Sequence, residues 1–498
     1  MSVSSAILGL VEYAVRKGLL ASEDKTWAAN SMLGHLRLSG IEPSATTAEL
    51  PLEELIDVLI DDAVERGIIP NTSANRDLLD TALMGSITPR PSEVGKHFQA
   101  LYSESSRTAT DWFYRFCMDC NYIREYRLEK DVKWTYTGKY GEMEITINLA
   151  KPEKDPLDIA AALHAEKSAY PSCQLCRENE GYFGRADYPG RQNLRIVPIK
   201  ILGENWGFQY SPYVYYNEHS IVLNDIHTPM LIDESCFRKL FDFIDKFPHY
   251  FVGSNADLPI VGGSILSHEH FQSGRYEFPI ERAEIIEELP VSSLSGVSIG
   301  HLNWPLPTLR LKGEKSETLA KTAGIILNAW RVYDDPSVDI LSNTDGTPHN
   351  TITPIARMHG GLYEMDLVLR NNRTTAQHPL GLFHPHAELH HIKKENIGLI
   401  EVMGLAILPP HLKTELSLLG EAMLTGGDLQ RPEISRHAEW AEEILIRRKL
   451  TRENIDVVLR EEVGAVFEKC LEHAGVFAQD EKGKTAFRRF ADELIKLL

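Results

Sequence analysis

The chain has 498 residues, 43% of them hydrophobic, and a formal net charge of -19. This length suits about three ordinary domains, and the composition is that of a globular protein. The negative charge argues against a general nucleic-acid binder, because such binding needs a basic face that releases counterions. A nucleotide can still bind at a local site, such as a helix N-terminus.

The N-terminus, the hydropathy and the cysteines indicate a cytoplasmic protein. The first apolar stretch follows no basic residue and soon meets Glu12, which is typical of an amphipathic helix and not of a signal peptide. The most apolar stretch, residues 397–408, is short and carries Glu401, so we expect no membrane span and no membrane partner. Six cysteines in so long a chain form no disulfide framework, which favours a reducing compartment.

Residues 1–128 are predicted to form a helical N-terminal region. Apolar residues recur at helical spacing over 52–63, where Thr46 or Thr47 is a candidate N-cap, and again over 111–123. The second stripe contains Cys117-Met-Asp-Cys120, which we interpret as core packing because no histidine cluster is near it in sequence.

From about residue 129 the pattern changes to alternating strands. Residues 132–149 predict a hairpin, followed by a polar break at 151–156 and a short helix near 159–168. Strand-like runs and turns then alternate up to residue 410, and the chain is predicted to be helical again over 411–498. The strand-like runs are 194–199, 213–216, 220–223 and 398–408, and helices are expected at 233–246 and 316–329.

Two His-x-His elements suggest a duplicated unit, because His384-Pro-His386 repeats the pattern of His268-Glu-His270. We therefore predict an α+β fold, in which a duplicated antiparallel-sheet catalytic body is flanked by helical N- and C-terminal regions. The predicted segments are a helical N-terminal region (1–128), a first half of the body (129–280), a second half (281–410) and a helical C-terminal region (411–498). The candidate nucleophile and metal site described below fall in the first half.

The most informative motif is Gly-Gly-Ser-Ile-Leu-Ser-His-Glu-His-Phe-Gln at 262–272. In extended backbone alternate side chains share a face, so we expect His268, His270 and Gln272 together, opposite Glu269 and Phe271. Neutral imidazole is a competent nucleophile toward phosphorus, which makes His270 the candidate nucleophile. Its other ring nitrogen must be held by a hydrogen bond, commonly to a backbone carbonyl.

Gln272 favours group transfer over hydrolysis. A third histidine at this position could protonate a poor leaving group, whereas an amide can only donate a hydrogen bond to a phosphoryl oxygen. That is sufficient when the leaving group is already a good one, such as a sugar phosphate. Gly262, Gly263 and Ser264 are candidate phosphate-binding residues, because their backbone N–H groups can approach the phosphate closely.

Two cysteines and two histidines form a candidate metal site. Cys173 and Cys176 are spaced to bind one metal, and His219 and His268 would complete a closed tetrahedral set. Such a set suits Zn²⁺ in a structural role, since no position is left for a reacting water. The alternative is a pair of unrelated reduced cysteines with surface histidines.

These motifs, in this order, resemble those of the galactose-1-phosphate uridylyltransferases, the transferase branch of the histidine-triad superfamily. The sequence is similar to the bacterial class II form over nearly the whole chain, and the segments 144–156, 257–272 and 349–357 support this resemblance. The class I form has proline at the position of Glu269 and Ser-Asn-Pro at the positions of 265–267.

The resemblance implies a ping-pong transfer of UMP from UDP-glucose to galactose 1-phosphate through a uridylyl-histidine. It assigns His270 as the nucleophile, Gln272 and Arg357 to the substrate, and the two cysteines with His219 and His268 to zinc. It also implies a homodimer. A second metal of class I would fall at His384 and His386, joined by His359 and by one of Glu281, Glu284 and Glu287.

Two alternatives differ in chemistry. One is a phosphorylase or hydrolase of the same superfamily acting on a dinucleoside polyphosphate, although Gln272 argues against hydrolysis. The other is a zinc-stabilised binding module without catalysis, in which His270 would have no structural task.

Overall fold

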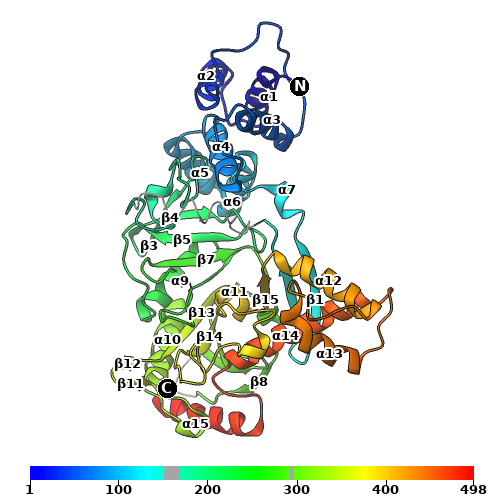
Figure 1. Cartoon of the computed structure of the whole chain (residues 1–498). Helices are drawn as coiled ribbons and strands as arrows, with labels where there is room; N and C mark the ends of the chain where they lie inside the picture. The colour runs from blue at the N-terminus through cyan, green and yellow to red at the C-terminus, as the bar shows by residue number, and fades with distance from the viewer. Residues whose placement is uncertain (151–167, 264, 292–295) are drawn as a thin grey trace.

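A ten-stranded antiparallel sheet forms the centre of the computed structural model, which describes residues 1–150, 168–263, 265–291 and 296–498 (Figure 1). Its strands, in spatial order, are β3 (Val197–Ile201), β4 (Glu204–Tyr210), β5 (Ser220–Asn224), β7 (His270–Gly274), β6 (Phe251–Gly253), β13 (Asn350–His359), β14 (Leu362–Asn371), β10 (Thr308–Gly313), β9 (Val297–Leu302) and β8 (Ile285–Glu288).

The two halves of this sheet repeat one topology. Each half contains three successive strands, a helix, and two more strands, of which the last lies beside the third. The first half has the order β3-β4-β5-β7-β6 with helix α9 (Glu234–Lys246), and the second has β8-β9-β10-β14-β13 with α10 (Ser316–Arg331). The halves join where β6 pairs with β13. The predicted duplicated antiparallel body is confirmed, although the two His-x-His elements do not occupy equivalent positions, because His270 begins β7 whereas His384 and His386 follow β14.

Helix α9 covers the face of the sheet that carries Phe271. Its buried residues Phe237, Leu240 and Ile244 recur at helical spacing, which gives the helix one apolar side. Phe271 is 1% exposed and stacks on Trp206, with ring centroids 5.1 Å apart. Because successive side chains of a strand alternate in direction, the packing of Phe271 turns His270 and Gln272 to the opposite face.

The N-terminal region is helical, as predicted, and lies at one end of the sheet (Figure 1). The expected N-cap at Thr46 or Thr47 is wrong, because the third helix begins at Leu52, directly after Pro51, without a side-chain cap. The helices are α1 (Val3–Arg16), α2 (Lys25–Leu36), α3 (Leu52–Glu65), α4 (Ser73–Gly85), α5 (Pro91–Glu104), α6 (Ser106–Asp119) and α7 (Glu125–Leu128).

A separate three-stranded sheet links the predicted hairpin to the end of the body. Strands β1 (Val132–Gly138) and β2 (Gly141–Ile147) form the hairpin, and β15 (Leu405–Leu408) adds to β2 in parallel. The strand predicted over 398–408 is therefore only half correct, because helix α11 (Leu399–Val402) precedes β15. Residues 213–216 form no strand, and the predicted break at 151–156 and nearly all of the helix near 159–168 lie outside the described residues.

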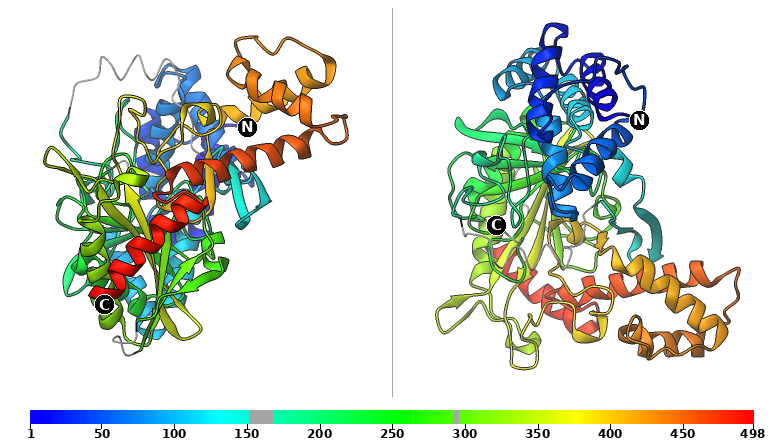
Figure 2. Two further views of the ribbon diagram at one scale, coloured as in Figure 1. Left: turned by 90° about the horizontal axis from the view of Figure 1, so that it is seen from below. Right: turned by 45° about the horizontal axis from the view of Figure 1, so that its top comes forward.

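The C-terminal region is helical, as expected. Helices α12 and α13 stand apart from the large sheet, whereas α15 returns to it (Figure 2). The helices are α12 (His411–Thr425), α13 (Ala438–Arg447), α14 (Ile455–Ala474) and α15 (Glu481–Leu497), and the short strands β11 (Asn343–Thr344) and β12 (Thr347–Pro348) form a two-stranded ribbon. Among the described helices, none is both long and apolar enough to cross a membrane.

Candidate functional site

His270 and Gln272 line one wall of a cavity of about 630 Å³, within the usual range for a small-molecule site. Both belong to β7, and Ile221, which pairs with Gln272 on β5, lines the same wall. The predicted face of the motif is therefore present for His270 and Gln272. Glu269 points the other way, toward α9, where its carboxylate lies 2.7 Å from Lys239.

The ring of His270 is fixed by its own strand. Its Nδ1 lies 2.8 Å from the backbone carbonyl oxygen of His268, the kind of partner expected from the sequence. With Nδ1 donating to this carbonyl, Nε2 carries the lone pair, and no hydrogen bond to Nε2 occurs in the described part of the chain. Burial lowers the pKa of His270 to about 4, so the imidazole is neutral at pH 7. A neutral, oriented imidazole at a cavity wall is able to act as a nucleophile.

Gln272 is held by a histidine. Its Oε1 lies 3.1 Å from Nε2 of His219, which is also part of the cavity wall. The amide nitrogen of Gln272 is then free to donate a hydrogen bond into the cavity.

Residues between 393 and 410 also line the cavity. Lys393 is 3% exposed, and its Nζ lies 3.0 Å from a carboxylate oxygen of Glu401. Burial alone would lower the pKa of Lys393, but Glu401 and Glu395 raise it above its ordinary value. The cavity lining therefore includes a cation held between two carboxylates.

The small residues before the histidines have different positions. Gly263 lines the cavity, and a Cβ at this position would meet the side chain of Asn255 at 2.8 Å. Gly262 packs beneath it, where a Cβ would lie 2.4 Å from the carbonyl oxygen of Ala256. Ser264 lies outside the described residues. Close packing thus requires both glycines, and Gly263 borders the cavity that His270 lines.

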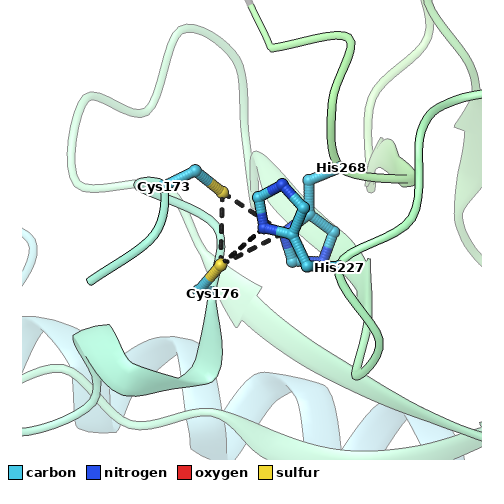
Figure 3. A group of neighbouring side chains, drawn as sticks. All are labelled: Cys173, Cys176, His227 and His268. Carbon is cyan, nitrogen blue, oxygen red and sulfur yellow. Dashed lines mark hydrogen bonds between the residues drawn. The ribbon is translucent and has the colours of Figure 1, made fainter. Parts of the chain in front are cut away.

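Cys173, Cys176, His227 and His268 form a four-residue group beside this cavity (Figure 3). Nδ1 of His268 lies 3.2 Å from Sγ of Cys173, and Nδ1 of His227 lies 3.0 Å from Sγ of Cys176. The two sulfur atoms are 3.4 Å apart. Burial raises the pKa of Cys173, but hydrogen bonds from His268 and from the Leu175 backbone bring it below its ordinary value.

This donor set fits a tetrahedral metal ion. Ligands at about 2.0–2.3 Å from Zn²⁺ lie about 3.5 Å from one another, close to the separations observed here. His268 also directs its second ring nitrogen, Nε2, to the carbonyl oxygen of Asn224 at 2.7 Å, as metal-bound histidines commonly do. Leu175, between the two cysteines, lines the cavity and so connects the group to the site of chemistry.

The structure does not bring His219 to this group, which corrects the set expected from the sequence. His219 precedes β5, and β5 runs antiparallel to β7, so His219 lies beside Gln272 near the far end of β7. His227 follows β5 and therefore lies beside His268, which precedes β7. The pairing of these two strands is the signal that identifies His227, and the sequence alone does not supply it.

The second His-x-His is divided between two environments. The ring nitrogens of His384 lie 2.9 Å from the Pro385 carbonyl oxygen and 3.3 Å from Oδ1 of Asn396. His386 instead forms a group with Glu388 and His473, the latter on α14. The partners implied by the resemblance, His359, Glu281, Glu284 and Glu287, do not belong to this group.

Arg357 is placed in a buried ion-pair cluster, and it does not line the cavity. Its guanidinium contacts Glu364, and it lies 2.9 Å from Asp366. Burial alone would lower the pKa of Arg357, but the carboxylates of Asp366, Glu281 and Glu364 raise it above its ordinary value. This arrangement gives Arg357 a role in holding β13 to β14. Because Arg357 does not line the cavity, its position does not support a role in substrate binding.

Comparison with known proteins gives matches to both parts of one family. "Galactose-1-phosphate uridyl transferase, N-terminal domain" matches residues 41–229, and the corresponding C-terminal domain matches residues 243–442. A yeast Ap4A phosphorylase structure covers 77% of this chain and 97% of its own at 10% identity, with a TM-score of 0.35, a likeness too weak to support an argument.

Curated relatives match over almost their full length. Galactose-1-phosphate uridylyltransferase of Bacillus subtilis (strain 168) is 47% identical over 505 residues, covering 99% of this chain and 98% of the relative. That of Clostridium acetobutylicum is 46% identical over 502 residues, covering 99% and 100%. That of Lactococcus lactis subsp. cremoris (strain SK11) is 46% identical over 494 residues, covering 99% of each. The chain belongs to the galactose-1-phosphate uridylyltransferase family.

Proposed function

We propose that this protein transfers the uridylyl group of UDP-glucose to galactose 1-phosphate through a covalent intermediate on His270. The observation that carries the proposal is the hydrogen bond from Nδ1 of His270 to the His268 carbonyl, which leaves Nε2 to attack from the cavity wall. The reaction products are UDP-galactose and glucose 1-phosphate.

The transfer has two displacements at one phosphorus atom. In the first, the lone pair of His270 Nε2 forms a bond to the α-phosphorus of UDP-glucose, and the bond from that phosphorus to the bridging oxygen breaks. Glucose 1-phosphate leaves with the electron pair. In the second, a phosphate oxygen of galactose 1-phosphate attacks the same phosphorus, and the N–P bond breaks to restore neutral His270.

Gln272 contributes a hydrogen bond to the charge that develops on the phosphoryl oxygens. Neither leaving group needs a proton. Glucose 1-phosphate leaves in the first displacement and the imidazole of His270 in the second, and both are good leaving groups without protonation. Lys393 also lines the cavity, but Glu401 and Glu395 compensate its charge.

A partial exchange reaction tests this function. With labelled glucose 1-phosphate and UDP-glucose, but without galactose 1-phosphate, the wild type should move label into UDP-glucose, because the first displacement is reversible on its own. His270→Asn should lower this exchange at least about a thousandfold, since no nucleophile remains. His359→Asn is the matched control, because His359 is an exposed residue at the end of β13, and its exchange rate should equal that of the wild type. Absence of exchange in an enzyme that turns over both substrates would contradict the covalent route.

We also propose one structural Zn²⁺ in each chain, held by Cys173, Cys176, His227 and His268. When bound, this ion would fix the loop before β7 and so the backbone carbonyl that orients His270. The second group, His386 with Glu388 and His473, offers only three ligands, and Glu388 is exposed. We therefore propose no second metal at this group.

Metal content measured on purified variants distinguishes the two histidines near β5. His227→Ala should lose most of the zinc, whereas His219→Ala should retain one equivalent. Loss of zinc in His219→Ala with retention in His227→Ala would contradict the proposed ligand set, and two equivalents in the wild type would contradict a single metal.

Two further proposals concern location and assembly. None of the six cysteines forms a disulfide, which supports a reducing compartment such as the cytoplasm. We propose a homodimer on the basis of the family resemblance. Light scattering should give twice the chain mass of 56.2 kDa, and a mass equal to one chain would contradict the dimer.

A further inference from the structure

His219 lies directly behind Gln272 in the cavity wall. It comes two residues before Ile221, and Ile221 pairs with Gln272 in the β5–β7 register, so the three side chains share one face of the sheet. Nε2 of His219 lies 3.1 Å from Oε1 of Gln272. The neighbouring pair, Ser220 and Ser273, faces the other side, where its hydroxyl groups lie 2.6 Å apart.

The ring of His219 is held in place. It is 3% exposed and packs against the rings of Tyr215 and Tyr216, with centroid distances of 5.3 and 4.5 Å. Its backbone N–H donates to the carbonyl oxygen of Tyr216 at 3.1 Å. A ring confined in this way presents Nε2 to Gln272 in a fixed direction.

The unsatisfied nitrogen of His219 indicates which tautomer is present. Nδ1 is buried and has no hydrogen-bond partner in the described part of the chain. If Nδ1 carried the proton, a buried N–H donor would be left without an acceptor, which is a costly arrangement. Burial lowers the pKa of His219 to about 4, so the ring is neutral and has one proton. That proton is best placed on Nε2, where Gln272 accepts it.

We propose that His219 is a positioning residue that fixes the amide of Gln272. Its Nε2–H donates to Oε1 of Gln272, so that the amide oxygen is turned away from the cavity and the amide N–H groups are turned toward the phosphoryl oxygens. Without this bond the amide is able to rotate, and half of its orientations place a carbonyl oxygen against an anionic group. The proposal deepens the proposed function, on which it rests, and names the residue that makes Gln272 a donor.

A double-mutant cycle tests this role through the rate of uridylyl transfer to His270, measured by rapid quench with UDP-glucose alone. His219→Phe keeps a ring against the two tyrosines but removes the donor, and it should slow the transfer by about tenfold to a hundredfold. In a Gln272→Ala background the same change should alter the rate by less than about twofold, because its only target is absent. His219→Gln places an N–H near the position of Nε2 and should recover at least about fivefold over His219→Phe.

The outcomes that overturn the proposal are distinct from those that overturn the function. Equal slowing by His219→Phe with and without Gln272, or no recovery in a folded His219→Gln protein, would show a merely structural role. If His219→Phe does not fold, His219→Asn replaces it in the cycle, because its short amide cannot reach Gln272. Ser220→Ala is the matched control: it removes the cross-strand hydrogen bond that faces away from the cavity, and its rate should stay within about twofold of the wild type.

A second measurement does not depend on activity. ¹⁵N shifts of labelled histidine should show the ring of residue 219, assigned by loss of its signals in His219→Gln, as the Nε2–H tautomer. The Nδ1–H tautomer would overturn the proposal. If the wild type formed no uridylyl adduct, the proposed function would fail, whereas the tautomer would still decide whether His219 donates to Gln272.

Discussion

In the proposed transfer, Gln272 would determine which molecules can accept the uridylyl group. An amide donates a hydrogen bond but cannot take a proton from water, so an activated water is not formed beside the phosphorus. Galactose 1-phosphate is already an anionic nucleophile and needs no such base. In the proposed transfer, an amide at this position would therefore protect the intermediate from hydrolysis.

Replacing Gln272 by histidine should remove this protection. An imidazole at this position is able to accept a proton from water, so Gln272→His should raise the ratio of UMP released to UDP-galactose formed by about tenfold or more. Chromatography of the products at equal UDP-glucose concentrations measures the ratio. Gln272→Asn, which keeps the amide but shortens it, serves as the control for lost positioning, and an unchanged ratio in Gln272→His would refute the argument.

Among the elements, α9 holds the backbone of the motif from behind. Glu269 is 7% exposed, and its carboxylate lies 2.7 Å from Lys239 of α9 and 2.8 Å from the amide nitrogen of Asn224. The proline of the class I form could make neither contact. In this chain an ion pair therefore ties the two histidines to the helix that covers the opposite face of the sheet.

Glu269→Gln should destabilise the fold by about 2–4 kcal/mol, because it leaves the Lys239 ammonium largely buried without its counter-charge. Urea denaturation measures the change. Glu234→Gln is the matched control on the same helix, since its ion pair with Arg238 is exposed and should contribute nothing measurable. Equal midpoints for wild type and Glu269→Gln would show that the buried pair does not hold the motif.

The site also shows what a single sequence can and cannot predict. The alternation in residues 268–272 gave the right face for His270 and Gln272, because it depends only on the period of a strand. The choice between His219 and His227 depends on which strands pair and in which direction, and no local pattern contains that information. The same limit explains Arg357, whose three carboxylate partners come from distant positions and from the neighbouring strand.

At the scale of the whole molecule, the C-terminal helix returns to the second half of the sheet. The ring of Phe487 on α15 stacks on His301 of β9 at a centroid distance of 3.7 Å. Arg489 pairs with Asp335 at 2.5 Å, close to the loop after α10. The seventeen-residue helix α15 (Glu481–Leu497) thus packs against β9 and against the segment that follows α10.

This contact should make stability depend on pH. Burial lowers the pKa of His301 to about 4 in the folded state, from an ordinary value of 6.5. The neutral ring therefore favours folding fully above about pH 6.5, and this contribution is lost as the pH falls toward 4. His301→Phe keeps the stacking and cannot be protonated, so between pH 8 and pH 5 it should lose up to about 2 kcal/mol less stability than the wild type. Denaturant titrations at the two pH values measure the difference, and identical losses would contradict the assignment.

The proposed mechanism requires a covalent bond to His270, and intact-mass analysis tests for this bond most directly. After brief exposure to UDP-glucose without acceptor, the wild type should gain the mass of one uridylyl group, which peptide analysis should map to His270 and galactose 1-phosphate should remove. An enzyme that turns over both substrates but shows no adduct, or one that carries the adduct on another residue, would contradict the proposed mechanism.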